Sequence, residues 1–233
     1  ARFSRNQEPY IPDRENSYIG IMLHDITGKG IDEPYRMFTS RSEYRLIMRT
    51  DNADIRLSGD AHRLGMIGAS EIEKVEEKKK KIERWKELLR TTRGKQLLEI
   101  PDVQISWPEG ILQQNLMEIL KRPEIRIENM YPFLKRNEGK EDLDEETLKI
   151  VEIEVKYEGY VARQGKEAEK SRKMRGMNLP ADMDYARIDG LSREIREKLE
   201  RRKPANLKEA SEIPGVTPAA IMILRIYLEM RKK

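Results

Sequence analysis

The chain has 233 residues, enough for one large domain or two small ones. Charged residues make up 38% and hydrophobic residues 37%, so the core must come from amphipathic elements rather than from long apolar runs. No stretch approaches the roughly 20 apolar residues that span a bilayer. Without cysteine, disulfides and thiol nucleophiles are excluded. The net charge of +4 is small, so a surface that binds nucleic acid would have to be local.

The first part of the chain has a polar start and then an apolar segment. Residues 1–16 are polar, contain Pro9 and Pro12 and begin without methionine, so we interpret them as a severed connector at the start of a fragment. Residues 17–26 (SYIGIMLHDI) are apolar enough to be buried as a helix or as a strand.

Arginine is concentrated in residues 33–57 (EPYRMFTSRSEYRLIMRTDNADIRL), which we call the arginine segment. Arg41, Arg45 and Arg49 are four apart and would line up along one face of a helix. Ser40 followed by Glu43 fits a capping box, which predicts that this helix begins there. A row of guanidinium groups suits bidentate contact with phosphates. The same spacing is also typical of a surface helix whose arginines pair with acidic residues of the fold.

Residues 70–90 are predicted to form a helix that Ser70 caps, with Glu73 completing a capping box. Its apolar residues recur at helical spacing: Ile72, Val75, Ile82, Trp85 and Leu89. The lysines at positions 78–81 interrupt this stripe, and we interpret them as a solvated face rather than as a nucleic-acid site.

The middle of the chain is less regular. Residues 100–110 contain two prolines and short apolar pieces, which predicts a loop with minor extended segments. A short helix is expected over residues 111–120, before Pro123. Residues 138–146 are acidic and mark the expected domain boundary. Residues 148–173 are predicted to form a helix with an acidic start and a basic end, which complements the helix dipole.

Two similar turns occur near the end of the chain, at residues 188–192 (IDGLS) and 213–217 (IPGVT). Ser192 and Thr217 are placed to cap the helices that follow, and Pro218 fits a first helical position. Such turns occur in helix-hairpin-helix modules, whose exposed N–H groups bind phosphate. They are also typical of an ordinary connection in a small bundle, which is the interpretation that we favour.

These patterns predict an all-α protein. We expect a connector over residues 1–16, a bundle-like helical region over residues 17–150 that contains the arginine segment, and a small helical subdomain over residues 151–233. His24 and His62 are far apart and lack metal-ligand spacing, so no metal site is expected. Neither a G-x-G-x-x-G motif after a strand nor a Walker A motif is present, and no catalytic residue can be assigned.

Several long motifs resemble the GidA (MnmG) family: EPYRMFTSRSEYRL and DNADIRL in the arginine segment, VKYEGYVARQ at residues 155–164, DYARIDGLSREIREKL at residues 184–199 and PANLKEASEIPGVTPAAI at residues 204–221. They occur in the family's order, and the resemblance covers most of residues 17–233. It implies the C-terminal part of a cytoplasmic enzyme that uses FAD and NADH, together with the GTPase MnmE, to install aminomethyl or carboxymethylaminomethyl groups at carbon 5 of the tRNA wobble uridine.

The resemblance also implies roles for parts of this chain. Family members carry their FAD site and reactive cysteines upstream, so this fragment is expected to bind no cofactor and to be inactive alone. Full-length members are expected to form homodimers. tRNA contact is expected from four arginines: Arg36, Arg41, Arg45 and Arg49. Docking to MnmE is expected from the last turn and helix, through Gly215, Val216, Pro218, Ile221 and Leu224.

Two other readings of the sequence stay open. A DNA-binding helix-hairpin-helix module would depend on Gly190 and Gly215, although relatives often have a basic residue where Glu212 stands, which weakens a phosphate-binding role for the second turn. A purely structural interaction domain would use its arginines to neutralise internal carboxylates.

Overall fold

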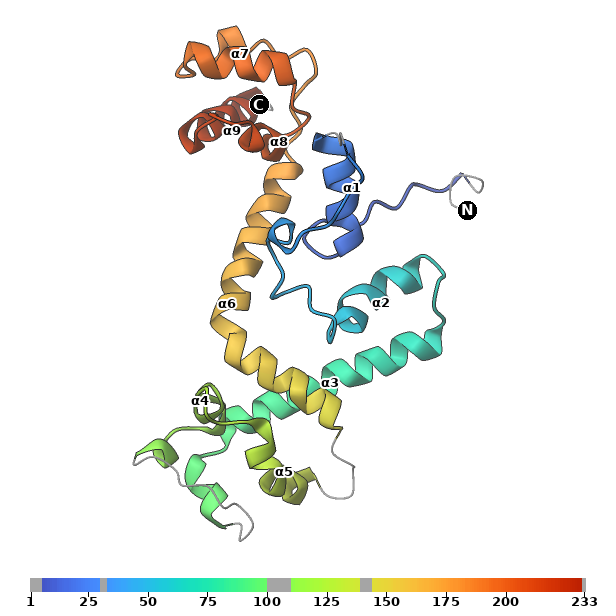
Figure 1. Ribbon diagram of the computed structural model, residues 1–233, viewed down its shortest axis with the longest axis vertical. Helices are drawn as coiled ribbons and strands as arrows, with labels where there is room; N and C mark the ends of the chain where they lie inside the picture. The colour runs from blue at the N-terminus through green and yellow to red at the C-terminus, as the bar shows by residue number, and fades with distance from the viewer. Residues whose placement is uncertain (1–5, 30–32, 100–109, 139–143, 232–233) are drawn as a thin grey trace. The chain divides into compact units, whose positions relative to one another are not determined.

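The computed structural model of the protein describes residues 6–29, 33–99, 110–138 and 144–231, and it is built from helices (Figure 1). No residue within these ranges belongs to a β-strand, and the predicted all-α fold is confirmed. No helix of the described ranges is both long and apolar enough to cross a membrane. Of the extended segments predicted around residues 100–110, residues 100–109 lie outside the described ranges, and Gly110 is in a turn.

The chain divides into two compact units, residues 1–164 (unit 1) and residues 165–233 (unit 2). The helices of unit 1 are α1 (Tyr18–Lys29), α2 (Ala53–Arg63), α3 (Ala69–Thr91), α4 (Leu116–Leu120), α5 (Tyr131–Glu138) and most of α6 (Glu145–Arg175). Unit 2 contains the end of α6, α7 (Arg193–Arg202), α8 (Leu207–Glu212) and α9 (Pro218–Arg231). Short 3-10 helices lie between them: η2 (Thr39–Arg41), η3 (Gly94–Glu99), η4 (Ile111–Gln113), η5 (Ile127–Met130) and η6 (Tyr185–Arg187). The division expected at residue 150 falls inside α6, which runs through it as one helix.

The core of unit 1 is centred on α3. Ile82, Trp85 and Leu89 are buried among side chains of α4, α5 and the first half of α6, as their spacing predicts. The predicted cap is wrong by two residues. The backbone N–H of Gly68 donates to the carboxylate of Glu71 at 3.1 Å, so the helix begins after Gly68 and is not capped by Ser70. The periodicity of a helix is therefore a better guide to its buried face than to its first residue.

The predicted helix over residues 148–173 is confirmed as the central part of α6. Asp144 caps its start: the carboxylate accepts the backbone N–H groups of Glu146 and Thr147, at 3.1 and 3.3 Å, and the hydroxyl of Thr147. The hydrogen bond from the Thr147 hydroxyl is the main cause that lowers the pKa of Asp144. The basic residues of the last turn follow the expected charge pattern.

Unit 2 contains the two turns expected from the sequence. Gly190 and Gly215 have φ of 86° and 90°, the left-handed region that favours glycine. Ser192 Oγ accepts the N–H of Ile195 at 3.4 Å to cap α7, while Thr217 Oγ1 accepts the N–H of Ala220 at 3.3 Å, just after Pro218 begins α9. The helices close around one apolar core: Leu179, Met183, Tyr185, Ile188, Leu191, Ile195, Leu199, Leu207, Ala210, Ala220, Leu224 and Leu228.

The apolar segment at residues 17–26 forms most of α1, but burial of the whole segment is a wrong prediction. Ile21 is buried, whereas Ile19 is 62% exposed and Leu23 42% exposed. On the buried side, Gly20 allows the backbone of residue 13 to pack directly against α1, because a Cβ at position 20 would overlap the carbonyl group of Asp13. Apolar composition predicts the helix but does not predict what covers each of its faces.

The helix predicted over the arginine segment is wrong. Residues 39–41 form the short 3-10 helix η2, and turns follow through residue 47, so Arg41, Arg45 and Arg49 do not share a helix face. Ser40 lies within η2 and caps nothing. The backbone of this segment instead bonds to distant side chains: Gln164 Oε1 accepts the N–H of Leu46 at 3.2 Å, and Gln164 Nε2 donates to the carbonyl of Glu43 at 3.1 Å.

Candidate nucleic-acid interface

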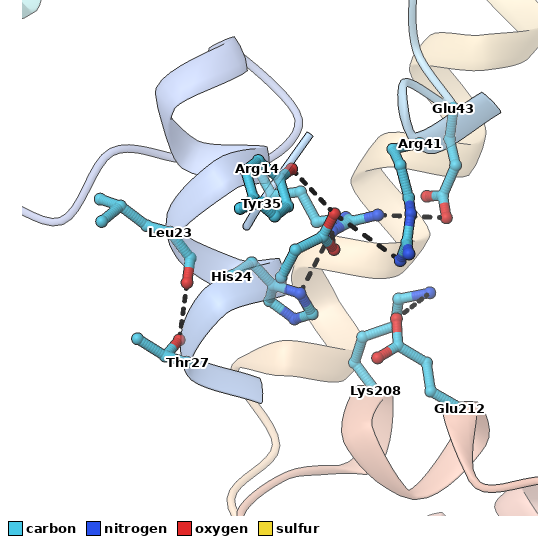
Figure 2. Close-up of polar contacts among 10 residues, drawn as sticks. Arg14, Leu23, His24, Thr27, Tyr35, Arg41, Glu43, Lys208 and Glu212 are labelled. Carbon is cyan, nitrogen blue, oxygen red and sulfur yellow. Dashed lines mark hydrogen bonds and ion pairs between the residues drawn. The ribbon is translucent and has the colours of Figure 1, made fainter. Parts of the chain in front are cut away.

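A buried arginine anchors the arginine segment to α1, in a cluster that we call the Arg14 network (Figure 2). The Arg14 side chain is only 6% exposed, and its Nη1 donates to Asp25 Oδ1 at 3.1 Å and lies 3.1 Å from His24 Nδ1. Its Nη2 donates to Glu43 Oε1 at 3.4 Å. Arg14 therefore joins the start of the chain, α1 and the arginine segment.

Asp25 is the acidic centre of this network, with a side chain 3% exposed. The Tyr35 hydroxyl donates to its Oδ2 at 3.2 Å, and Arg41 Nη1 lies 3.8 Å from the same oxygen. Burial, and then the charge of Asp25, raise the pKa of Tyr35. Arg41 is 41% exposed and can still face solvent from this position.

Two of the four candidate arginines have guanidinium groups that form no ion pair with a carboxylate of the described residues. Arg36 is exposed and lies over the Phe38 ring, 5.5 Å from its centroid. Arg45 is exposed and makes no hydrogen bond or ion pair with any residue that the structure describes. Exposed guanidinium groups on an anchored segment are suited to bidentate contact with phosphate oxygens.

Arg49 is held inside the fold instead. Its Nε donates to both carboxylate oxygens of Asp51 at 3.1 Å, its Nη1 donates to the carbonyl of Leu46 at 3.1 Å, and its side chain is 14% exposed. The interpretation of the arginines as partners of internal carboxylates thus fits Arg49, and in part Arg41. The same interpretation does not fit Arg36 and Arg45.

The residues expected to dock a partner separate in a similar way. Gly215 and Pro218 are exposed and Val216 and Ile221 are half-buried, whereas Leu224 is fully buried in the core of unit 2. Three large apolar side chains on α9, one turn apart, are exposed to solvent: Met222, Ile226 and Met230. Their i, i+4, i+8 spacing places them on one face of the helix.

Glu212, at the second of the two turns, pairs with Lys208 at 3.4 Å on α8, as Figure 2 shows. The pair neutralises the acidic side chain of Glu212. Gly215 is also close to a charged side chain, since a Cβ there would overlap the ammonium group of Lys198. In the described residues, no group of three or more histidines and acids is arranged to hold a metal ion.

Two family models match the chain, and together they cover most of both units. One, described as the tRNA modifying enzyme MnmG/GidA C-terminal helical domain, matches residues 69–165; the other, described as the tRNA modifying enzyme MnmG/GidA C-terminal helical bundle, matches residues 167–233. The chain belongs to the MnmG/GidA family. The border between the two matches lies at nearly the same place as the border between the two units.

Similarity to individual MnmG proteins extends over the whole chain. The tRNA uridine 5-carboxymethylaminomethyl modification enzyme MnmG of Heliobacterium modesticaldum is 40% identical over 100% of this chain and 37% of its own length, and that of Listeria welshimeri is 38% identical with the same coverage. Aquifex aeolicus GidA, in its form II crystal, superposes with a TM-score of 0.72 at 36% identity, over 97% of this chain and 35% of that one. The chain spans about a third of the length of these MnmG relatives, and the inferred resemblance to the family's C-terminal region is confirmed.

The sequence did not single out three features that the structure shows: Arg14, Gln164 and the exposed tyrosines of α6. Arg14 lies in the expected connector and gives no local signal, because a single arginine among polar residues has many uses. Gln164 also lacks a local signal, although it stands within the VKYEGYVARQ motif. Tyr157 and Tyr160 continue the apolar spacing of α6, yet they are 44% and 60% exposed.

Proposed function

We propose that this chain is the tRNA-binding and partner-docking region of an MnmG-type enzyme that modifies carbon 5 of the tRNA wobble uridine. The curated relatives are named for this class of modification. The whole protein would be a cytoplasmic homodimer that uses FAD and NADH and acts with MnmE. This chain would contribute binding and would not be catalytic on its own.

The observation that carries the tRNA-binding role is the pair of exposed guanidinium groups, Arg36 and Arg45, on a segment anchored by a buried network. Arg41 lies between them in the sequence and is 41% exposed. A phosphate ligand would gain charge-assisted hydrogen bonds without the breaking of an existing ion pair of Arg36 or Arg45. Because the Arg14 network holds the segment, less conformational entropy is lost on binding than for a free loop.

The described residues do not fit an FAD site. A dinucleotide site of the common kind requires a glycine-rich turn between a strand and a helix, with N–H groups directed at the pyrophosphate. The described ranges contain no strand from which such a turn could start. We therefore assign the flavin, and the chemistry that it supplies, to another part of the protein.

A titration with unmodified tRNA at two salt concentrations tests the tRNA-binding role, with a DNA duplex of similar length as competitor. The double variant Arg36→Ala/Arg45→Ala is expected to weaken binding and to lower the salt dependence by about one unit of slope for each lost phosphate contact. Arg90→Ala is the matched control, since Arg90 is an exposed arginine on α3 that pairs with Glu87. An unchanged salt slope in a folded double variant would refute the assignment.

The DNA competitor addresses the helix-hairpin-helix alternative, which the left-handed glycines Gly190 and Gly215 keep open. In one outcome, the duplex binds as tightly as tRNA, Gly215→Ala weakens both complexes, and Arg36→Ala/Arg45→Ala weakens neither. The phosphate site would then belong to the turns of unit 2. Preference for tRNA with dependence on Arg45 would assign it to unit 1.

The docking role is assigned to the turn at Gly215, Val216, Pro218 and Ile221 together with the exposed stripe of α9. Deletion of residues 204–233 would remove core residues such as Leu224, so it would test folding as much as docking. Met222→Glu/Ile226→Glu changes only exposed side chains, and it is expected to abolish co-elution of the full-length protein with MnmE. Persistent co-elution of this variant would place the docking surface elsewhere.

A further inference from the structure

An exposed pair of tyrosines stands on α6 within unit 1. Tyr157 is 44% exposed and Tyr160 60% exposed, and their ring centroids lie 6.4 Å apart with an angle of 54° between the planes. The rings are three residues apart and so lie on adjacent parts of the helix surface. Two large aromatic rings that face solvent together differ from the single exposed apolar residues that are normal on protein surfaces.

The tyrosines share a face of α6 with Gln164, which follows Tyr160 by four residues and Tyr157 by seven. Along the helix axis these separations are about 6 and 10 Å. Gln164 is the side chain that binds the backbone of the turn at residues 43–46, and Arg45 projects from this turn into solvent. Tyr157 and Tyr160 therefore lie within about two helical turns of the side chain that holds the turn carrying Arg45.

The charges near the rings suit a polyanion. Two glutamates of α6 next to them are already paired with lysines, Glu154 with Lys86 at 3.2 Å and Glu158 with Lys121 at 3.0 Å. Arg163 follows the pair on α6, is exposed, and makes no hydrogen bond or ion pair within the described ranges. Arg163 on α6 and Arg45 on the turn that Gln164 holds are thus two cations that make no ion pair within the described ranges.

We propose that Tyr157 and Tyr160 form a stacking platform for unpaired bases of RNA, next to the phosphate contact made by Arg45. This inference rests on the proposed tRNA-binding function and assigns it a base-contacting site. Aromatic rings stack on any base, so the platform would bind a single-stranded loop with little sequence preference. A double helix, whose bases are already stacked, would not engage it.

The proposal is tested with the 233-residue chain and a short unstructured RNA that carries one 2-aminopurine, whose fluorescence is quenched when the base stacks. Tyr157→Ala/Tyr160→Ala is expected to lower the affinity about 5- to 150-fold for each stacked base lost and to abolish the quenching. The salt slope should stay unchanged, because no charge is removed. Tyr157→Phe/Tyr160→Phe should retain both affinity and quenching.

The leucine variant Tyr157→Leu/Tyr160→Leu distinguishes stacking from a general apolar contact. If it binds the RNA as well as the unaltered chain, the rings do not act by stacking and the proposal is overturned. Equal binding by a folded alanine variant would also overturn it, while an effect of Arg45→Ala in the same assay would leave the proposed tRNA-binding function intact. No binding by the unaltered chain at low salt would refute both.

Discussion

Replacement of Asp25 by asparagine should destabilise unit 1 specifically. Asp25 receives hydrogen bonds from Arg14 at 3.1 Å and Tyr35 at 3.2 Å, and the two side chains of the ion pair are 3% and 6% exposed. An asparagine of nearly the same size removes the charge and leaves Arg14 with the more distant Glu43, at 3.4 Å. The loss of one partner from a buried ion pair costs about 3–5 kcal/mol when nothing replaces it. Because Glu43 remains, we expect a smaller cost of about 2–3 kcal/mol.

Urea unfolding followed by tryptophan fluorescence measures this change, since Trp85 is buried in the core of unit 1 and the sequence of unit 2 contains no tryptophan. The control is Glu87→Gln, which breaks an exposed pair with Arg90 and should alter the free energy of unfolding by less than about 1 kcal/mol. If Asp25→Asn changes the stability no more than this control does, the Arg14 network does not anchor the arginine segment. In that event Arg45 is not held ready for a ligand either.

Three further predictions concern stability. Gly20→Ala would place a Cβ against the backbone carbonyl of Asp13 and should destabilise unit 1 by about 1–3 kcal/mol. Gly59→Ala, in α2 with open space around it, should instead stabilise unit 1 by about 0.5–1 kcal/mol. Urea unfolding measures both changes, and a stabilising effect of Gly20→Ala would contradict the close packing against Asp13. Asp144→Ala should cost about 1 kcal/mol through the lost cap of α6. Since the pKa of Asp144 is lowered, that difference should be present above its ordinary value of 3.8 and disappear as the pH falls below it, as thermal unfolding over a pH series would show. Burial, and then the hydrogen bond to Asp60, raise the pKa of Tyr10 from 10.0 to about 12. The contribution of Tyr10 to the free energy of unfolding should therefore be lost as the pH rises from 10 to 12. The Tyr10→Phe variant should not show this pH-dependent loss of stability.

The features that sequence predicted well are those that depend on neighbours in the chain. The stripe of Ile82, Trp85 and Leu89 is buried on α3 as expected, because a helical period identifies the face that packs. The turns of unit 2 formed because glycine accepts the left-handed backbone and Ser192 can cap the helix after it. Each of these signals comes from residues close together in the chain.

The arginine segment shows why the rest could not be predicted. A spacing of four residues favours a helix, but the segment satisfies its backbone through Gln164 and places Arg14 against Asp25. Partners so distant in sequence leave no trace in a local pattern. Consequently, the sequence identified the region that presents arginines, while the structure was needed to separate Arg45, which is exposed, from Arg49, which is held inside.

The two hydrogen bonds of Gln164 also constrain the order of events during synthesis and folding. The turn at residues 43–46 leaves the ribosome more than a hundred residues before its partner, so this turn cannot take its final form until α6 has been made. Closing so long a loop is slow compared with the formation of a single helix. Exchange of the Leu46 amide with deuterium should therefore slow only after α6 has docked, and it would report the assembly of the surface that carries Arg45.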